Sequence, residues 1–310
     1  MPSRKNYPKM SKQTTITQPV SLSGKGLHTG KQVAVTFRPA PADHGVVFRR
    51  IDLPEQTLVH ALGQHVFDTS RGTSIQENGA EVRTIEHLMA ALAGMQVDNV
   101  LIDIDGPETP ILDGSSRLYV EALQKTDIVE LPADRKYFTV KEKTTFSIPE
   151  KQIEITVEPA DDFRIEVDVD YGTQVLAAQH AVLNDLREFV PEFYDCRTFV
   201  FLHELLFLVQ HNLAHGGDVD NAIVFVSQVP PPEVLQQLAE FFHKSDLRVT
   251  ENGILNNVEL RHDNEPARHK LLDVVGDLYL LGHPLKGHVR ASRPGHFPNT
   301  ELVKLLLKQQ

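Results

Sequence analysis

The sequence predicts an α+β protein made of two topologically related domains, each a β-sheet layered with helices, with the active site between them. Each half of the chain runs from several short strands to one helix that carries polar residues, over 84–94 and 266–282. The segment 153–160, IEITVEPA, echoes 33–40, VAVTFRPA, with threonine and Pro-Ala at matching offsets. A length of 310 residues suits two medium-sized domains.

Composition and charge exclude several classes of protein. Hydrophobic residues make up 41% and charged residues 24%, as in ordinary globular proteins. A formal net charge of −11 argues against a nucleic-acid partner, although a local basic pocket for one diphosphate remains compatible with it. The single cysteine, Cys196, excludes an intrachain disulfide and fits a reducing compartment, so we expect a cytoplasmic protein. The most apolar stretch, 199–209, is too short and too polar for a transmembrane segment.

The chain is expected to begin with a disordered tail over 1–13, which is basic and has no apolar run behind it. An N-terminal domain over 14–130 and a C-terminal domain over 137–310 would be joined by a linker at 131–136, where the sequence reads LPAD.

In the first half, alternation predicts strands over 33–39 and 45–48. Three glycines within 24–30 precede a strand and not a helix, so this loop is not a phosphate-binding P-loop. Thr84 as N-cap and Gly94 as stop delimit the helix 84–94. A buried strand over 100–104 and a helix over 119–125 follow.

In the second half, the echo predicts a strand over 153–160, and Pro230–Pro232 precede a helix over 233–242. Leucine and valine at helical spacing, with Pro266 early, predict the helix 266–282, and the last helix covers 299–307.

The helix 266–282 carries His269, Asp273 and Asp277 at intervals of four. Such residues share one face, which offers two metal ligands and a carboxylate able to orient a neighbour. The alternative is an ion-paired surface face that includes Arg268 and Lys270.

Three further residues have the chemistry of a catalytic site. Glu86 and His87 lie in an otherwise apolar helix, where adjacent side chains point in different directions, so one of the two should point away from solvent or lie at a domain interface. The alternative is that both belong to an exposed stripe of the helix. His296 follows a stiff Arg-Pro-Gly turn that could hold its ring in place. The alternative is that His296 is an ordinary histidine of a surface loop. His87, His269 and Asp273 would form a catalytic zinc set, with Glu86 as general base and His296 as acid. Spacing does not establish this set, because 182 residues separate the two histidines.

Six motifs in order resemble those of the UDP-3-O-acyl-N-acetylglucosamine deacetylases, zinc amidohydrolases of lipid A (lipopolysaccharide) biosynthesis in Gram-negative bacteria. They are GLHTG at 26–30, TIEHL at 84–88, DGS at 113–115, RTF at 197–199, HKLLDVVGD at 269–277 and PGH at 294–296. The resemblance covers about 18–307, although the family often has Ser-Gly-His where this chain has Pro294-Gly295-His296.

The resemblance implies roles for individual residues. One Zn²⁺ per chain would be bound by His87, His269 and Asp273, and Glu86 would deprotonate the attacking water. Thr198 would stabilise the oxyanion together with the zinc. His296, oriented by Asp277, would protonate the leaving amine, giving acetate and the free amine.

The resemblance also implies a substrate with a UDP group and a long acyl chain. A βαβ-type insert around 195–226 would form an apolar passage for the acyl chain, and Phe199 would contact the acyl chain there. The alternative is that this segment is a plain core helix. Lys141, Lys270 and Arg293 fall where the family places cations near the diphosphate and hexose, or are solvated surface charges. Some relatives are fused to a 3-hydroxyacyl-carrier-protein dehydratase, and the sequence leaves open whether this chain is part of such a longer bifunctional protein.

Two other functions remain open from the residues alone. A metal hydrolase on the same scaffold would act on a different amide or ester. An α+β binding module would hold any metal as a closed structural site with four protein ligands.

Overall fold

The computed structural model describes residues 10–211 and 215–309. The N-terminal domain is built on a five-stranded sheet in the order β2-β3-β9-β4-β5. Alternating buried and less buried residues in β3 show that one face of this sheet packs on the core. The strands are β2 (Val20–Lys25), β3 (Gln32–Pro39), β4 (Val46–Arg50), β5 (Leu58–His60) and β9 (Val100–Ile104).

The C-terminal domain contains a sheet in the order β12-β13-β18-β14-β15. A short strand, β11 (Phe138–Thr139), runs parallel to the beginning of β18. The other strands are β12 (Thr144–Ile148), β13 (Ile153–Glu158), β14 (Phe163–Val169), β15 (Gln179–Leu183) and β18 (Leu285–Ser292).

The two sheets have the same strand order and the same strand directions. Within each five-strand order, with β11 set aside, one neighbouring pair is parallel, β4 with β9 and β14 with β18, and the other neighbours are antiparallel. The echoed segments form the equivalent strands β3 and β13. The prediction of two topologically related α+β domains is therefore confirmed.

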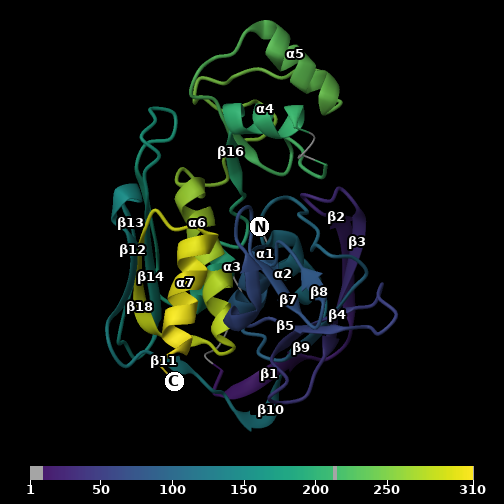
Figure 1. Ribbon diagram of the computed structural model, residues 1–310, viewed down its shortest axis with the longest axis vertical. Helices are drawn as coiled ribbons and strands as arrows, with labels where there is room; N and C mark the ends of the chain where they lie inside the picture. Colours follow the sequence, from purple (N-terminus) through teal and green to yellow (C-terminus); the bar gives the residue numbers. More distant parts are fainter. Residues whose placement is uncertain (1–9, 212–214, 310) are drawn as a thin grey trace.

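The helices follow the same duplication. α1 (Glu86–Gly94) precedes β9 as α6 (Glu265–Leu278) precedes β18, and α2 (Arg117–Leu123) and α7 (His296–Leu307) follow those strands. Every residue of α1 is buried, and α1 packs against α6 across the junction of the domains. Figure 1 shows α6 and α7 between the C-terminal sheet and the N-terminal domain. One hydrophobic core runs through both domains, so they form a single packed unit.

Each domain also has an insertion before its central helix. In the N-terminal domain it is a small sheet of β6 (Val66–Asp68), β7 (Ser74–Glu77) and β8 (Ala80–Val82). In the C-terminal domain, α3 (Phe189–Glu192) is followed by β16 (Phe199–Phe201), α4 (Leu202–Gln210), β17 (Ile223–Phe225) and α5 (Pro232–Phe241). β16 and β17 are parallel, and α4 and α5 project at one end of the molecule (Figure 1).

Several predicted boundaries differ from the structure. Of the expected tail, residues 1–9 lie outside the described part, but Lys12 and Gln13 belong to β1 (Lys12–Ile16). β1 pairs with β10 (Ile128–Asp134), which takes up 131–134 of the expected linker. The cause is a pairing between segments more than 100 residues apart, which no local pattern predicts.

The capping of α1 also differs from the prediction. Thr84 has a φ of +56°, Ile85 is the N-cap, and Gly94 is the last helical residue and not the stop after it. Within the described residues, none of the helices combines the length and the apolar character needed to cross a membrane.

Candidate metal centre

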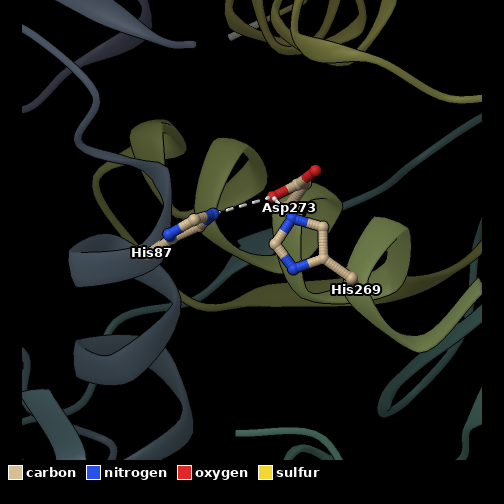
Figure 2. Close-up of side chains that lie close together, drawn as sticks. All are labelled: His87, His269 and Asp273. Atoms are coloured by element: carbon tan, nitrogen blue, oxygen red, sulfur yellow. Dashed lines mark ion pairs between the residues drawn. The ribbon is translucent and has the colours of Figure 1, made fainter. Parts of the chain in front are cut away.

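The three predicted metal ligands meet at the junction of the domains. His87 is contributed by α1, and His269 and Asp273 by α6 (Figure 2). One ligand atom from each of the three lies within 4.8 Å of the other two, and all three residues are buried. Asp273 Oδ1 is 3.6 Å from His87 Nε2 and 3.4 Å from His269 Nε2. The spacing of four residues thus places an imidazole and a carboxylate on one face of α6, as predicted.

His269 is fixed in one tautomer. Its Nδ1 lies 3.0 Å from the carbonyl oxygen of Cys196, which only accepts, so Nδ1 carries the proton and Nε2 presents its lone pair. Burial lowers the pKa of His269 to about 3, against the opposing effect of Asp273, so the ring is neutral at pH 7. A buried ion pair between Arg197 and Glu265, 2.9 Å apart, holds the neighbouring segment against the start of α6. The chain around Cys196 therefore orients the candidate metal ligand His269 through its backbone.

Asp273 carries the observation that fits a bound cation. Lys270 Nζ donates to Oδ2 over 2.9 Å, but the buried Oδ1 has no hydrogen-bond partner among the residues that the structure describes. Burial alone would raise the pKa of Asp273, but His269 and Lys270 hold it well below its usual range. An anionic oxygen thus faces the Nε2 lone pair of His269 with no donor between them. A cation at this point would satisfy both groups, and two histidines with one carboxylate are a familiar zinc set.

Glu86 and His296 form a second pair beside these ligands. His296 Nε2 lies 3.9 Å from Glu86 Oε1, although Glu86 begins α1 and His296 begins α7. Burial alone would lower the pKa of His296, but the carboxylates of Glu86 and Asp277 outweigh it and raise this pKa to about 9. His296 is therefore a cation at neutral pH beside a carboxylate, which is the pairing of a proton donor with a proton acceptor.

Asp277 orients His296. Its Oδ2 lies 3.2 Å from His296 Nδ1 and accepts a hydrogen bond of 2.8 Å from Asn299 Nδ2. Its Oδ1 accepts from the hydroxyl of Thr73. With these three contacts the buried carboxylate keeps a proton on Nδ1 of His296 and leaves Nε2 toward Glu86.

The predicted substrate-binding residues lie at different distances from this centre. Lys270 Nζ is 5.7 Å from the centroid of the Phe199 ring, beside Asp273. Thr198 is fixed through its backbone, with N donating to the carbonyl of Gly114 over 2.7 Å. These contacts place Phe199, together with the adjacent Thr198, which was predicted as a catalytic residue, beside Lys270 of α6 and its partner Asp273.

The two remaining predicted cations differ in their placement. Arg293 lies three residues before His296, has a φ of +50° and pairs with Asp170 at 3.4 Å. Lys141 is exposed, and its neighbour Val140 bonds to Lys286 at the beginning of β18, whereas His296 follows the end of that strand. The structure therefore does not bring Lys141 to the site, because the register of β11 on β18 holds it at the far end of the sheet.

The sequence analysis missed two buried polar residues, Thr73 and Glu108. Glu108 is fully buried and accepts hydrogen bonds from the backbone amides of His28 and Thr29 and from the side chains of His28, Thr29 and Thr84. It thereby shapes the glycine-rich loop around 26–30. Both residues lie in irregular segments without periodicity, and only the polar character of their loops was visible.

A second group of ligand-type side chains, Asp195, Cys196 and His262, does not fit a metal equally well. His262 Nε2 already pairs with Asp195 Oδ1 at 2.9 Å. Burial and the neighbouring carboxylates raise the pKa of the Cys196 thiol well above its usual value, so the thiolate that would bind a metal is disfavoured.

Comparison with known proteins agrees with this geometry. The sequence model of the UDP-3-O-acyl N-acetylglycosamine deacetylase family matches residues 13–247 and 242–308. The chain belongs to this family. The two matched ranges include both domains and all three candidate ligands, so the UDP-3-O-acyl N-acetylglycosamine deacetylase family accounts for the whole fold described above. Its members are metalloenzymes, in keeping with the cluster of His87, His269 and Asp273.

Individual relatives of the deacetylase family are similar over almost all of this chain. A bifunctional enzyme LpxC/FabZ of Chlorobaculum tepidum is 46% identical over 96% of the chain and 64% of its own length. A protein of the same name from Porphyromonas gingivalis is 40% identical over 97% of the chain and 65% of its own length. The UDP-3-O-acyl-N-acetylglucosamine deacetylase of Syntrophotalea carbinolica is 38% identical, with coverages of 95% and 87%. The chain thus spans just under two thirds of the bifunctional relatives.

Proposed function

We propose that this chain hydrolyses the N-acetyl group of UDP-3-O-(3-hydroxyacyl)-N-acetylglucosamine, giving acetate and the free amine, the committed step of lipid A biosynthesis. The observation that carries the proposal is the convergence of His87, His269 and the unpaired Oδ1 of Asp273 beside the pair of Glu86 and His296. Ligands for a metal, a proton acceptor and a proton donor at one junction are the groups that amide hydrolysis needs. The name of the relative at 38% identity, UDP-3-O-acyl-N-acetylglucosamine deacetylase, supports the same substrate.

The metal in this proposal is one Zn²⁺ per chain, bound by His87, His269 and Asp273. Three protein ligands leave a fourth position open, as in catalytic zinc sites and unlike structural ones. When bound, zinc lowers the pKa of a coordinated water toward about 7 and polarises the acetamide carbonyl.

Glu86 is the general base. Its carboxylate accepts a proton from the attacking water, and the amide of Thr73, 2.9 Å from Oε2, holds it in place. His296 donates a proton from Nε2 to the leaving amine, while Asp277 retains the proton on Nδ1. Each of the two groups contributes about 10²–10⁴ to the rate.

Thr198 is assigned to the developing oxyanion. The hydrogen bonds of its backbone to Gly114 and Ile223 fix the main chain on both sides of the residue. A fixed main chain leaves the hydroxyl free to stabilise charge that develops on the acetamide oxygen.

The acyl chain of the substrate is assigned to the aromatic surface of the insert. Phe199 has its ring 5.4 Å from Tyr171 and 6.0 Å from Phe225, and Lys270 stands over its face. Lys270 and Arg293 are the proposed cations for the hexose and diphosphate. On this basis Phe199→Ala raises KM for a long-chain substrate more than for a short-chain one, whereas a plain core role would lower stability and leave the chain-length preference unchanged.

A deacetylation assay tests the proposal. The purified protein is incubated with the acylated UDP-N-acetylglucosamine substrate, and release of acetate is measured with chelator, without it, and after zinc is restored. Activity that is lost with chelator and recovered with zinc is the expected result. Activity on N-acetylglucosamine that lacks UDP and acyl groups would instead indicate a hydrolase of another specificity, and absence of all zinc-dependent activity would refute the proposal.

We also propose that the full-length protein carries a 3-hydroxyacyl-carrier-protein dehydratase, which the bifunctional names of the relatives at 40 and 46% identity support. The mass of the protein detected in lysates of its source organism, with an antibody against this chain, tests this part of the proposal.

A further inference from the structure

Thr73 is a buried residue that was not among the predicted site residues. It lies immediately before β7, in the small sheet inserted into the N-terminal domain, and its exposed fraction is 0%. Its backbone and its side chain both bond to groups of the proposed proton-transfer machinery, which come from two different domains.

The backbone of Thr73 is fixed to the start of α1. Its carbonyl oxygen accepts a hydrogen bond of 3.1 Å from the amide of Ile85, and its amide donates to Glu86 Oε2 over 2.9 Å. The preceding residue, Gly72, has a φ of +154°, and a Cβ there would lie 2.9 Å from Glu86 Oε1. The Gly72–Thr73 segment therefore packs directly on the carboxylate of Glu86 and restrains both of its oxygens.

The side chain of Thr73 reaches the other domain. Its Oγ1 donates to Asp277 Oδ1 and lies 3.3 Å from His296 Nδ1. A hydroxyl has one proton to donate and lone pairs to accept with. Because Asp277 takes that proton, Oγ1 can only accept from His296 Nδ1–H, which is then shared between Thr73 Oγ1 and Asp277 Oδ2 at 3.2 Å.

We propose that Thr73 is a positioning residue that aligns the proton acceptor Glu86 with the proton donor His296. The inference rests on the proposed function and adds to it a direct link between the two groups. Glu86 and His296 are 3.9 Å apart on helices of different domains, and Thr73 bonds to Glu86 and, through Asp277 and its own hydroxyl, to His296. Such alignment matters because small displacements of reacting groups cost large factors in rate.

Thr73→Val and Thr73→Ser separate the hydroxyl from the shape of the residue. Valine keeps the branching and the backbone amide but loses the hydroxyl, whereas serine keeps the hydroxyl. We expect Thr73→Val to lower kcat by about 10–100-fold, as for other groups that orient a reacting residue, with full zinc content. KM should stay within about 2-fold, since the proposed role of Thr73 is to align Glu86 and His296 and not to bind the substrate. Serine should restore most of kcat, and Thr73→Ala replaces valine if valine prevents folding.

A double variant shows whether the hydroxyl acts through Asp277. In an Asp277→Asn background, Thr73→Val should lower kcat by less than in the wild-type chain, because the contact through the Asp277 carboxylate is already altered and only the direct contact of the hydroxyl with His296 Nδ1 remains to be lost. Independent, multiplicative losses in the double variant would overturn this part of the inference, as would a serine variant as slow as the valine variant.

A measurement without turnover distinguishes this inference from the proposed function. Proton and nitrogen NMR of labelled imidazoles report the Nδ1–H of His296, and Thr73→Val should shift this resonance while Thr73→Ser leaves it near its wild-type position. If Thr73→Val shifts the His296 resonance but the wild-type protein has no deacetylase activity, the contact between Thr73 and His296 is supported and the proposed function is refuted. An unchanged resonance together with wild-type kcat in Thr73→Val would refute the role of Thr73.

Discussion

The carbonyl oxygen of Glu86 occupies the space into which a Cβ on Gly276 would project. This contact brings α1 and α6 together at the level of the candidate ligands, because His87 follows Glu86 and Asp273 lies one turn before Gly276. The metal centre therefore depends on a close approach of two helices that only glycine permits at this position.

Gly276→Ala tests the close contact of α1 and α6, because the contact decides whether the substitution raises or lowers the free energy of unfolding. In a helix with free space, alanine would stabilise the fold by about 1 kcal/mol relative to glycine. Here the added methyl group must displace the backbone of α1, so we expect a loss of about 1–3 kcal/mol in the free energy of unfolding. Zinc content should fall as well. Thermal unfolding and elemental analysis measure both, and a variant with a higher melting temperature and full zinc would contradict the described contact.

Asp273→Asn removes the charge of the proposed ligand with little change in shape. The neutral amide binds zinc weakly, so dialysed protein should keep less than about a tenth of the wild-type zinc. Asp277→Asn is the matched control, since Asp277 lies on the same helix but faces His296, and should retain the metal. Equal zinc content in the two variants, determined by elemental analysis, would remove Asp273 from the ligand set.

The pH dependence of kcat tests the charge of His296. Because the pKa of His296 is raised to about 9, the proton donor is present at neutral pH and is lost as the pH rises through about 9. Asp277→Asn removes one of the carboxylates that raise this pKa, so the alkaline limb of the profile should move to lower pH. A limb at the same pH in both proteins would show that another group titrates there.

Glu108 is expected to make the free energy of unfolding depend on pH in the acid range. Burial alone would raise its pKa, but hydrogen bonds from the ring and amide of His28 and the amide of Thr29 outweigh burial and lower the pKa to about 2. A glutamate in the unfolded chain has a pKa near 4.3. The stabilisation that Glu108 gives the folded protein is therefore fully present above about pH 4.3 and is lost as the pH falls through about 2.

Glu108→Gln removes this dependence. Urea unfolding with chelator present, which excludes effects of metal loss, should give a free energy of unfolding lower by about 1–3 kcal/mol at pH 7, because one accepting oxygen is replaced by an NH2 group that faces buried donors. The decline of stability between about pH 4 and pH 2 should also become shallower. The same slope in variant and wild type would contradict the role given to Glu108.

The sequence predicts the duplicated architecture because the duplication survives in residues, as in the echo of 33–40 by 153–160. It predicts His269 and Asp273 as neighbours because a helical repeat is a local property. His87 enters the same site only by tertiary packing over 182 residues, so its inclusion depended on the family resemblance.

Other features were out of reach for a related reason. The strand β10 replaces most of the expected linker because β1 pairs with it from the other end of the domain. Thr73 and Lys141 show the two errors that follow. Thr73 is a proposed positioning residue in a loop whose sequence indicated only polarity, and Lys141 is a cation that the sheet register holds away from the site.

The most direct test of the central claim is X-ray diffraction from crystals of the zinc-loaded protein, recorded on both sides of the zinc absorption edge. We predict one anomalous peak per chain, about 2.0–2.2 Å from Nε2 of His87, Nε2 of His269 and Oδ1 of Asp273. A zinc peak at another place, or zinc-loaded crystals with no peak between α1 and α6, would contradict the account.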